Sequence, residues 1–168
     1  MTRHGSQSDT ADPVWSNGEA RVEVDDYSPH WGNFHRLLDE RSASVDECLI
    51  WYDESRGEEC RWNHREWARD VVTAASLLSA AGVRQGSTVA ILATNRPETL
   101  LTAFAAWCLG ACFMPLDTRD TPEHHQRITQ GVDDLWIARI GSEGAYLSGR
   151  AVSMPDYARL RRKQASHA

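Results

Sequence analysis

Residues 88–117 decide the fold, and their sequence is TVAILATNRPETLLTAFAAWCLGACFMPLD. The first six residues, 88–93, form a continuous apolar run, which is typical of a strand buried on both faces. Pro97 is a favourable first residue of a helix, and apolar positions then repeat at helical spacing as far as Gly110. A second apolar run follows at 112–116. This order of strand, helix and strand predicts a parallel sheet with covering helices.

The sequence before this stretch predicts two helices and a hairpin. Asn63 and Glu66 have the spacing of a capping box, and Gly82 can supply the left-handed residue that ends the helix they begin. An amphipathic helix is expected from Asn33 to Ser42. The β-prone residues between Cys48 and Trp62, interrupted by a glycine turn, indicate a hairpin.

The sequence after this stretch continues the pattern more weakly. A helix is expected from Thr121 to about Gln130, and a third parallel strand from Asp134 to Ile140. Tyr146-Leu147 is predicted as an edge strand, and Pro155 to Gln164 as a basic surface helix. The predicted fold class is therefore α/β, a doubly wound, largely parallel sheet with helices on both faces.

The length of 168 residues indicates one folded domain. Residues 1–29 are polar and are expected to form an arm that is mobile or orders on a partner, with a single α/β domain at 30–152 and a basic C-terminal helix or tail at 153–168. No membrane span or export signal is visible. The four cysteines are therefore expected to be reduced thiols in a cytoplasmic protein.

The charged residues exclude some classes of function. The 18 basic and 24 acidic residues give a net charge of -6, which argues against nucleic acid as a partner. Lys163, near the C-terminus, is the only lysine, so chemistry that needs a buried lysine is nearly excluded.

Four short motifs carry a family resemblance. They are WNHREW at 62–67, Leu78 with GVRQGS at 82–87 and then VAI at 89–91, NRPE at 95–98, and GACFMPLD at 110–117. In this order they resemble the opening of the AMP-forming, adenylate-forming enzyme superfamily, which includes acyl-CoA synthetases, adenylation domains and luciferases. The resemblance covers about residues 30–140. It implies the family's first α/β lobe, which packs against a second lobe that holds most of the acyl and adenylate sites.

The sequence departs from the family in its nucleotide motifs. The family holds ATP with a Ser/Thr/Gly-rich loop ending in Pro-Lys-Gly, and also uses a Tyr-Gly-x-Thr-Glu motif, a ribose-binding Asp and a late Lys. The small residues at 141–145 include an acidic residue and no lysine, and Lys163 has no glycine-rich setting. We therefore expect no catalytic residue, no cofactor and no autonomous ATP-dependent ligase, while any other catalysis is left open.

A candidate binding site lies where the two strongest strands end, because open parallel sheets bind ligands beyond the carboxyl ends of their strands. These ends carry Asn95 and Arg96 on one strand, and Asp117 and Arg119 on the other. Turn and cap chemistry explains Asn95 and Asp117 equally well.

Other polar and sulfur-containing residues are given structural roles. His124 and His125 point about 100° apart on a helix and cannot hold one metal together, so we expect a solvated or capping role and no metal site. Cys108 and Cys112 are expected in the core. The basic residues of 159–163 are expected to form a solvated helix face, with a patch for an anionic partner as the alternative.

The leading hypothesis is a stand-alone first lobe that acts as a non-catalytic or split-enzyme partner in an acyl-activating, carrier-protein-dependent biosynthetic system. It would dock onto an adenylating enzyme, an acyltransferase or a carrier protein. One alternative is a protein or enzyme that binds a small acyl or aryl compound at the strand ends without ATP. Another is a homodimeric structural module.

Overall fold

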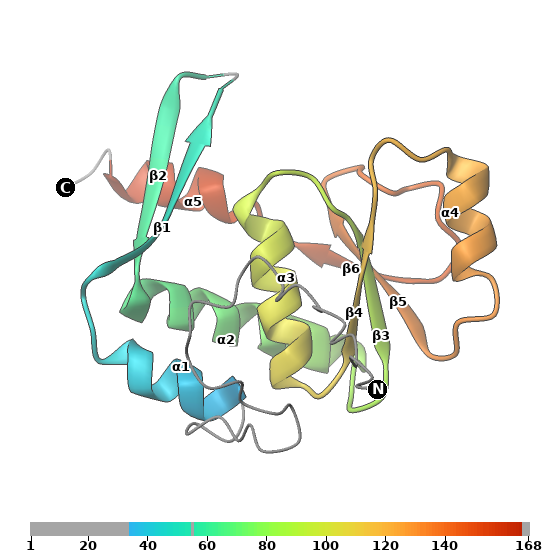
Figure 1. Cartoon of the computed structure of the whole chain (residues 1–168), viewed down its shortest axis with the longest axis horizontal. Helices are drawn as coiled ribbons and strands as arrows, with labels where there is room; N and C mark the ends of the chain where they lie inside the picture. The colour runs from blue at the N-terminus through green and yellow to red at the C-terminus, as the bar shows by residue number, and fades with distance from the viewer. Residues whose placement is uncertain (1–33, 55, 166–168) are drawn as a thin grey trace, which may run out of the picture. The chain divides into compact units, whose positions relative to one another are not determined.

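A computed structural model describes residues 34–54 and 56–165, with side chains as far as Arg161 in the last helix. The predicted arm at 1–29 lies outside the described residues. Figure 1 shows the elements in chain order: α1 Phe34–Ser42, β1 Glu47–Asp53, β2 Glu58–Asn63, α2 His64–Ala81, β3 Thr88–Leu92, α3 Pro97–Cys108, β4 Cys112–Leu116, α4 Pro122–Thr129, β5 Leu135–Ile140, β6 Arg150–Met154 and α5 Tyr157–Ala165.

The larger sheet has four parallel strands in the order β4-β3-β5-β6. Figure 1 shows α2 and α3 on one side of this sheet and α4 on the other. The predicted α/β class, with parallel strands and helices on both faces, is confirmed.

Each face of the sheet has its own apolar cluster. The strand residues that face α2 and α3 belong to the main core, which includes Val89, Ile91, Trp136, Ala138 and Ile140. The strand residues that alternate with them form a smaller cluster on the other face together with Leu147 of the turn segment. Ala90, Leu116, Ile137 and Leu147 are buried in it, whereas Leu92, Met114 and Leu135 are only partly buried. The second face is therefore the less completely covered one.

The predicted start and end of α2 are confirmed. The Asn63 side chain accepts a hydrogen bond from the Glu66 N–H at 2.8 Å, and the Glu66 carboxylate accepts one from the Asn63 N–H at 3.1 Å. Gly82 ends the helix with a φ of 114°, a conformation that costs glycine little because it has no Cβ.

The last strand was predicted at the wrong place. Residues 141–149 form turns instead of an edge strand at Tyr146-Leu147, and β6 follows at Arg150–Met154. Gly141 and Gly144 have φ values of 60° and 70°, which bend the chain before Tyr146 can pair with the sheet. Leu147 instead buries its side chain in the smaller cluster.

The two cysteines near the start of β4 differ in burial. Cys108 is buried at the end of α3, as predicted, but Cys112 is exposed and the core position expected for it is wrong. Cys112 begins β4, which among the described strands pairs only with β3 and therefore has an open edge.

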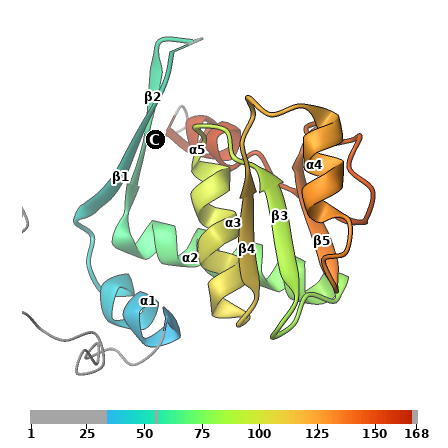
Figure 2. The same cartoon turned by 45° about the vertical axis from the view of Figure 1, so that its right-hand side comes forward.

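The strands β1 and β2 form the predicted hairpin, which extends away from the parallel sheet in Figure 2. Cys60 and Trp62 are buried on one face, and Ile50 and Tyr52 are exposed on the other. The Trp51 Nε1–H donates to the Asn95 carbonyl at 2.8 Å. The hairpin is thereby tied to the segment that follows β3.

The helix α5 packs on α3 and β2, and its buried Arg161 reaches α2. Arg161 donates to Asp70 at 3.0 Å and pairs with Glu66 at 2.6 Å, both on α2. The prediction of a solvated basic face is therefore wrong at Arg161. The proposed domain boundary at residue 152 falls within β6.

Candidate functional site

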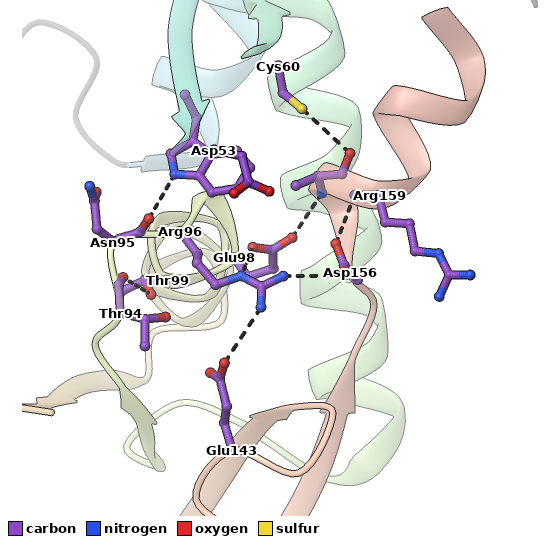
Figure 3. Close-up of polar contacts among 12 residues, drawn as sticks. Asp53, Cys60, Thr94, Asn95, Arg96, Glu98, Thr99, Glu143, Asp156 and Arg159 are labelled. Carbon is purple, nitrogen blue, oxygen red and sulfur yellow. Dashed lines mark hydrogen bonds and ion pairs between the residues drawn. The ribbon is translucent and has the colours of Figure 1, made fainter. Parts of the chain in front are cut away.

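The four predicted site residues follow the carboxyl ends of adjacent parallel strands, two after β3 and two after β4. Arg96 turns toward the segments that follow β5 and β6, as Figure 3 shows, whereas Asp117 and Arg119 contact each other. The structure thus forms two separate polar groups at one edge of the sheet.

The first group is centred on the guanidinium of Arg96. Its nitrogens lie 3.3 Å from Glu98, 3.6 Å from Glu143 and 3.3 Å from Asp156. Burial opposes the charged form of Arg96, but the attraction of Glu98, Asp156 and Glu143 outweighs it and raises the pKa of Arg96. Arg96 is thereby neutralised within this chain.

Glu98 is the most buried member of this group, with a fully buried side chain at the start of α3. One carboxylate oxygen accepts from the Arg96 Nε–H at 3.3 Å, and the other accepts from the Ala158 N–H of α5 at 2.9 Å. Glu98 therefore joins the first turn of α3 to α5.

The neighbouring Asn95 is exposed, and its backbone carbonyl receives the Trp51 hydrogen bond described above. The contribution of Asn95 seen in the structure is thus to hold the hairpin against the end of β3. A ligand-binding role for the Asn95 side chain stays a prediction.

The second group is a local ion pair. Arg119 donates to both oxygens of Asp117, at 3.0 Å from Nε to Oδ1 and 2.5 Å from Nη2 to Oδ2. These hydrogen bonds hold the pKa of Asp117 at about 2. Because the Arg119 side chain is 88% exposed, solvent screens the pair.

His125 contacts the backbone of the second group, although a solvated or capping role was expected for it. Its ring is buried, with Nε2 2.9 Å from the Asp117 carbonyl and Nδ1 2.5 Å from the Tyr146 hydroxyl. A carbonyl oxygen can only accept, so Nε2 carries a hydrogen, and in the neutral ring with this tautomer Nδ1 accepts from the Tyr146 hydroxyl. His125 thus fixes the loop after β4 against the turn segment that contains Tyr146.

Sequence reasoning missed the carboxylates that neutralise Arg96. Glu98 was noted only as the last residue of the NRPE motif, and Glu143 and Asp156 belong to segments far along the chain. No local pattern marks them. The signal that could have found them is the parallel order of the sheet, which brings the ends of β3, β5 and β6 to one edge.

The chemistry available at these strand ends is limited by charge pairing. Arg96 and Arg119 are each matched to carboxylates of the same chain, so an incoming phosphate would have to displace a carboxylate from either cation. Over residues 34–54 and 56–165, His, Cys, Asp and Glu side chains form no group of three that could hold a metal ion.

The profile of the family described as AMP-binding enzyme matches residues 40–133, which is more than half of the 168 residues. The chain belongs to this AMP-binding family. The matched residues include the four motifs quoted above, which extend from the end of β2 to the residue after β4. They also include Arg96, Glu98, Asp117 and Arg119 of the two polar groups.

Curated relatives include enzymes that form acyl-CoA. An indoleacetate–CoA ligase of Aromatoleum aromaticum is 55% identical over 53 residues, which cover 31% of this chain and 10% of the relative. The human mitochondrial acyl-coenzyme A synthetase ACSM2B is 29% identical over 91 residues, which cover 54% of this chain and 15% of the relative.

Solved structures of the AMP-binding family show the same fold. The N-terminal domain of FACL13 from Mycobacterium tuberculosis has a TM-score of 0.57 at 17% identity, covering 77% of this chain and 36% of that chain. The O-succinylbenzoate coenzyme A synthetase of Bacillus subtilis has a TM-score of 0.59 at 21% identity, covering 77% and 32%. The chain thus spans about a third of the solved chains that it matches.

The polar residues at the strand ends do not form a binding site for the phosphates of the nucleotide that the family name implies. Both arginines at the strand ends are already paired, and the 168 residues contain no Pro-Lys-Gly loop. Separately, the described helices include none with the length and apolar character to cross a bilayer.

Proposed function

We propose that this chain supplies the first α/β lobe of an adenylate-forming enzyme and acts as a non-catalytic or split-enzyme partner in an acyl-activating, carrier-protein-dependent pathway. Its partner is the second lobe, which carries the Pro-Lys-Gly loop and the late lysine that these 168 residues lack. The observation that carries this proposal is the neutralisation of Arg96 and Arg119 by carboxylates of this chain. A polyphosphate needs cations or free N–H groups, so these must come from elsewhere.

The open edge of β4 is the proposed docking surface. Trp107 is 45% exposed and packs against Phe113 of β4, with ring centroids 6.2 Å apart. Met114 is partly buried on the less covered face of the sheet. Partly covered apolar side chains on both faces of the sheet beside an open strand edge are typical of a surface that meets another chain.

Reconstitution with the second lobe, supplied as a separate polypeptide, tests this proposal. We expect neither protein alone to catalyse acyl-dependent exchange of pyrophosphate into ATP, and the mixture to do so. Met114→Glu should weaken the complex by placing a charge at the docking surface. Leu77→Glu, which changes a 37% exposed leucine on α2, is the matched control and should leave the complex intact.

Three results would contradict the proposal. The first is tight binding of ATP, or pyrophosphate exchange, by this chain alone. The second is a mixture whose activity and sedimentation are the same with Met114→Glu as with the original chain. The third is a concentration-dependent homodimer that this substitution disrupts, since it would assign the same edge to a second copy of the chain.

A further inference from the structure

A groove of about 490 Å³ lies between α1, β1, α2 and α3, away from the strand ends. Figure 2 shows these four elements beside one another. Most of the lining is apolar and comes from all of these elements: Leu37, Leu38, Leu49, Trp67, Leu100 and Phe104. Its volume is within the range of about 300–1,000 Å³ that is common for small-molecule sites.

The floor of the groove is formed by buried side chains and packed aromatic rings. Trp67 and Leu38 are buried in the main core, and Phe104 packs edge-to-face on Trp67 with ring centroids 5.6 Å apart. Leu100, one turn before Phe104 on α3, forms part of the wall and is 46% exposed. An apolar group placed here would cover Leu100 and gain contacts with both rings.

An arginine and a histidine are among the polar side chains of the groove. Arg41, in the last turn of α1, and His64, at the start of α2, both line it. Within the part of the chain that the structure describes, the Arg41 guanidinium has neither an ion pair nor a hydrogen bond. By contrast, Arg36 on the same helix is paired with Glu40 at 3.1 Å. Arg41 is therefore a cation available to a ligand.

We propose that this groove binds a small carboxylate with an apolar, aryl or alkyl body. The body lies against Trp67 and Phe104, and the carboxylate faces Arg41. A guanidinium presents parallel N–H donors that match the two oxygens of a carboxylate. One arginine balances one negative charge, so a monoanion fits the groove better than a phosphate ester does.

This site is separate from the strand ends and from the β4 edge, so its existence does not depend on the proposed docking function. It takes the ligand class that the sequence suggested for the strand ends, where Arg96 and Arg119 are already neutralised. The groove offers what that location lacks, which is a cation without a carboxylate partner beside an apolar surface.

The test uses the full chain with 4-phenylbutyrate as the probe and the uncharged 4-phenylbutanamide as its matched analogue. Two-dimensional ¹H–¹⁵N NMR follows the indole N–H of Trp67, assigned with Trp67→Phe, and the titration gives the Kd. We expect the acid to shift this signal and to bind more tightly than the amide by about tenfold, since a hydrogen bond to a charged group is stronger than a neutral one.

Paired variants separate the two parts of the ligand. Arg41→Ala should weaken binding of the acid about tenfold and leave the amide unchanged, whereas Arg36→Ala on the same helix should change neither. Leu100→Glu should abolish binding of both compounds. Leu160→Glu, which changes an equally exposed leucine on α5, should have no effect.

The proposal is overturned if 4-phenylbutyrate leaves the Trp67 signal unchanged, or if acid and amide bind equally well. It is also overturned if Arg41→Ala and Arg36→Ala have the same affinity. A loss of binding in Arg119→Ala, with Arg41→Ala unaffected, would move the site to the strand ends. Because Arg41 is an exposed helix residue, its variant tests the proposal even if Leu100→Glu does not fold.

Discussion

Arg161→Ala tests whether the C-terminal helix is held by a buried ion pair. The Arg161 side chain is 9% exposed and pairs with Asp70, which is 11% exposed, and with Glu66, which is 33% exposed. The substitution leaves Asp70 in the core with two remaining partners, the Trp62 Nε1–H at 3.0 Å and the exposed Arg69, whose Nε lies 3.5 Å away. It also removes the guanidinium from beside the Trp62 ring.

The expected loss of stability follows from these surroundings. Removing one partner of a buried ion pair costs about 3–5 kcal/mol, because the other charge stays buried and unpaired. Glu66 is partly hydrated and keeps its hydrogen bond from the Asn63 N–H, so it adds little. We therefore expect a loss near the lower limit, about 3 kcal/mol. With an m-value of about 2 kcal/mol/M, the urea midpoint would fall by about 1.5 M.

Equilibrium unfolding in urea, followed by tryptophan fluorescence, measures this loss. Arg159→Ala is the control, since Arg159 lies two residues earlier on α5 and is exposed, and it should change stability by less than about 0.5 kcal/mol. Asp70→Asn, added to Arg161→Ala, should restore part of the stability. The amide carries no charge and can still accept from the Trp62 indole.

Equal stabilities of Arg161→Ala and Arg159→Ala would refute the reasoning, because they would show that burial of the guanidinium has no energetic consequence. A double variant Asp70→Asn/Arg161→Ala less stable than Arg161→Ala alone would refute it as well. That result would show that the loss arises from packing and not from an unpaired carboxylate.

Three further predictions concern the strand ends and the turns. Arg119→Ala should raise the pKa of Asp117 from about 2 toward 3.8, as measured by NMR titration. A lowered carboxyl pKa stabilises the fold at pH values above the unfolded pKa. The original chain should therefore lose this stabilisation as the pH falls from 3.8 to about 2, whereas the variant has none to lose. Gly82→Ala should lower the thermal midpoint more than Gly86→Ala, because both have positive φ but only the first brings a Cβ to 3.1 Å from an indole ring. Trp51→Phe should cost about 1 kcal/mol and speed amide exchange in the hairpin, since its one hydrogen bond to the segment after β3 is lost.

Local signals predicted most of the fold because each element carries its own start and stop. The capping box at Asn63, the proline that begins α3 and the glycine after α2 need no distant partner to act. The apolar run of β3 indicated burial on both faces, and the order of strand, helix and strand predicted the parallel pairing of β3 with β4. The sequence alone was therefore sufficient for the fold class and for the elements from α2 to β4.

The errors arise where a residue's role depends on a distant contact. The strand β6 has the sequence RAVSM, with alternate residues exposed, so it lacks the apolar signal of β3, whereas Tyr146-Leu147 is β-prone but follows two left-handed glycines. Arg161 belongs to a basic run that is typical of a solvated face, and its partner Asp70 is 91 residues away. The same limit applies to Arg96, whose location was predicted but whose neutralisation was not.

The proline in β4 has a consequence for how this chain can associate. The N–H of Cys112 and the carbonyl of Leu116 form hydrogen bonds on the side of β3. Phe113 and Pro115 alternate with these residues, so their backbone polar groups point away from β3. Pro115 has no N–H, so among the residues of β4 that face away from β3 the backbone N–H of Phe113 alone can donate a hydrogen bond. Edge-to-edge pairing of copies along this side is therefore disfavoured, so the apolar side chains beside β4 can stay exposed without the edge serving as a template for fibrils.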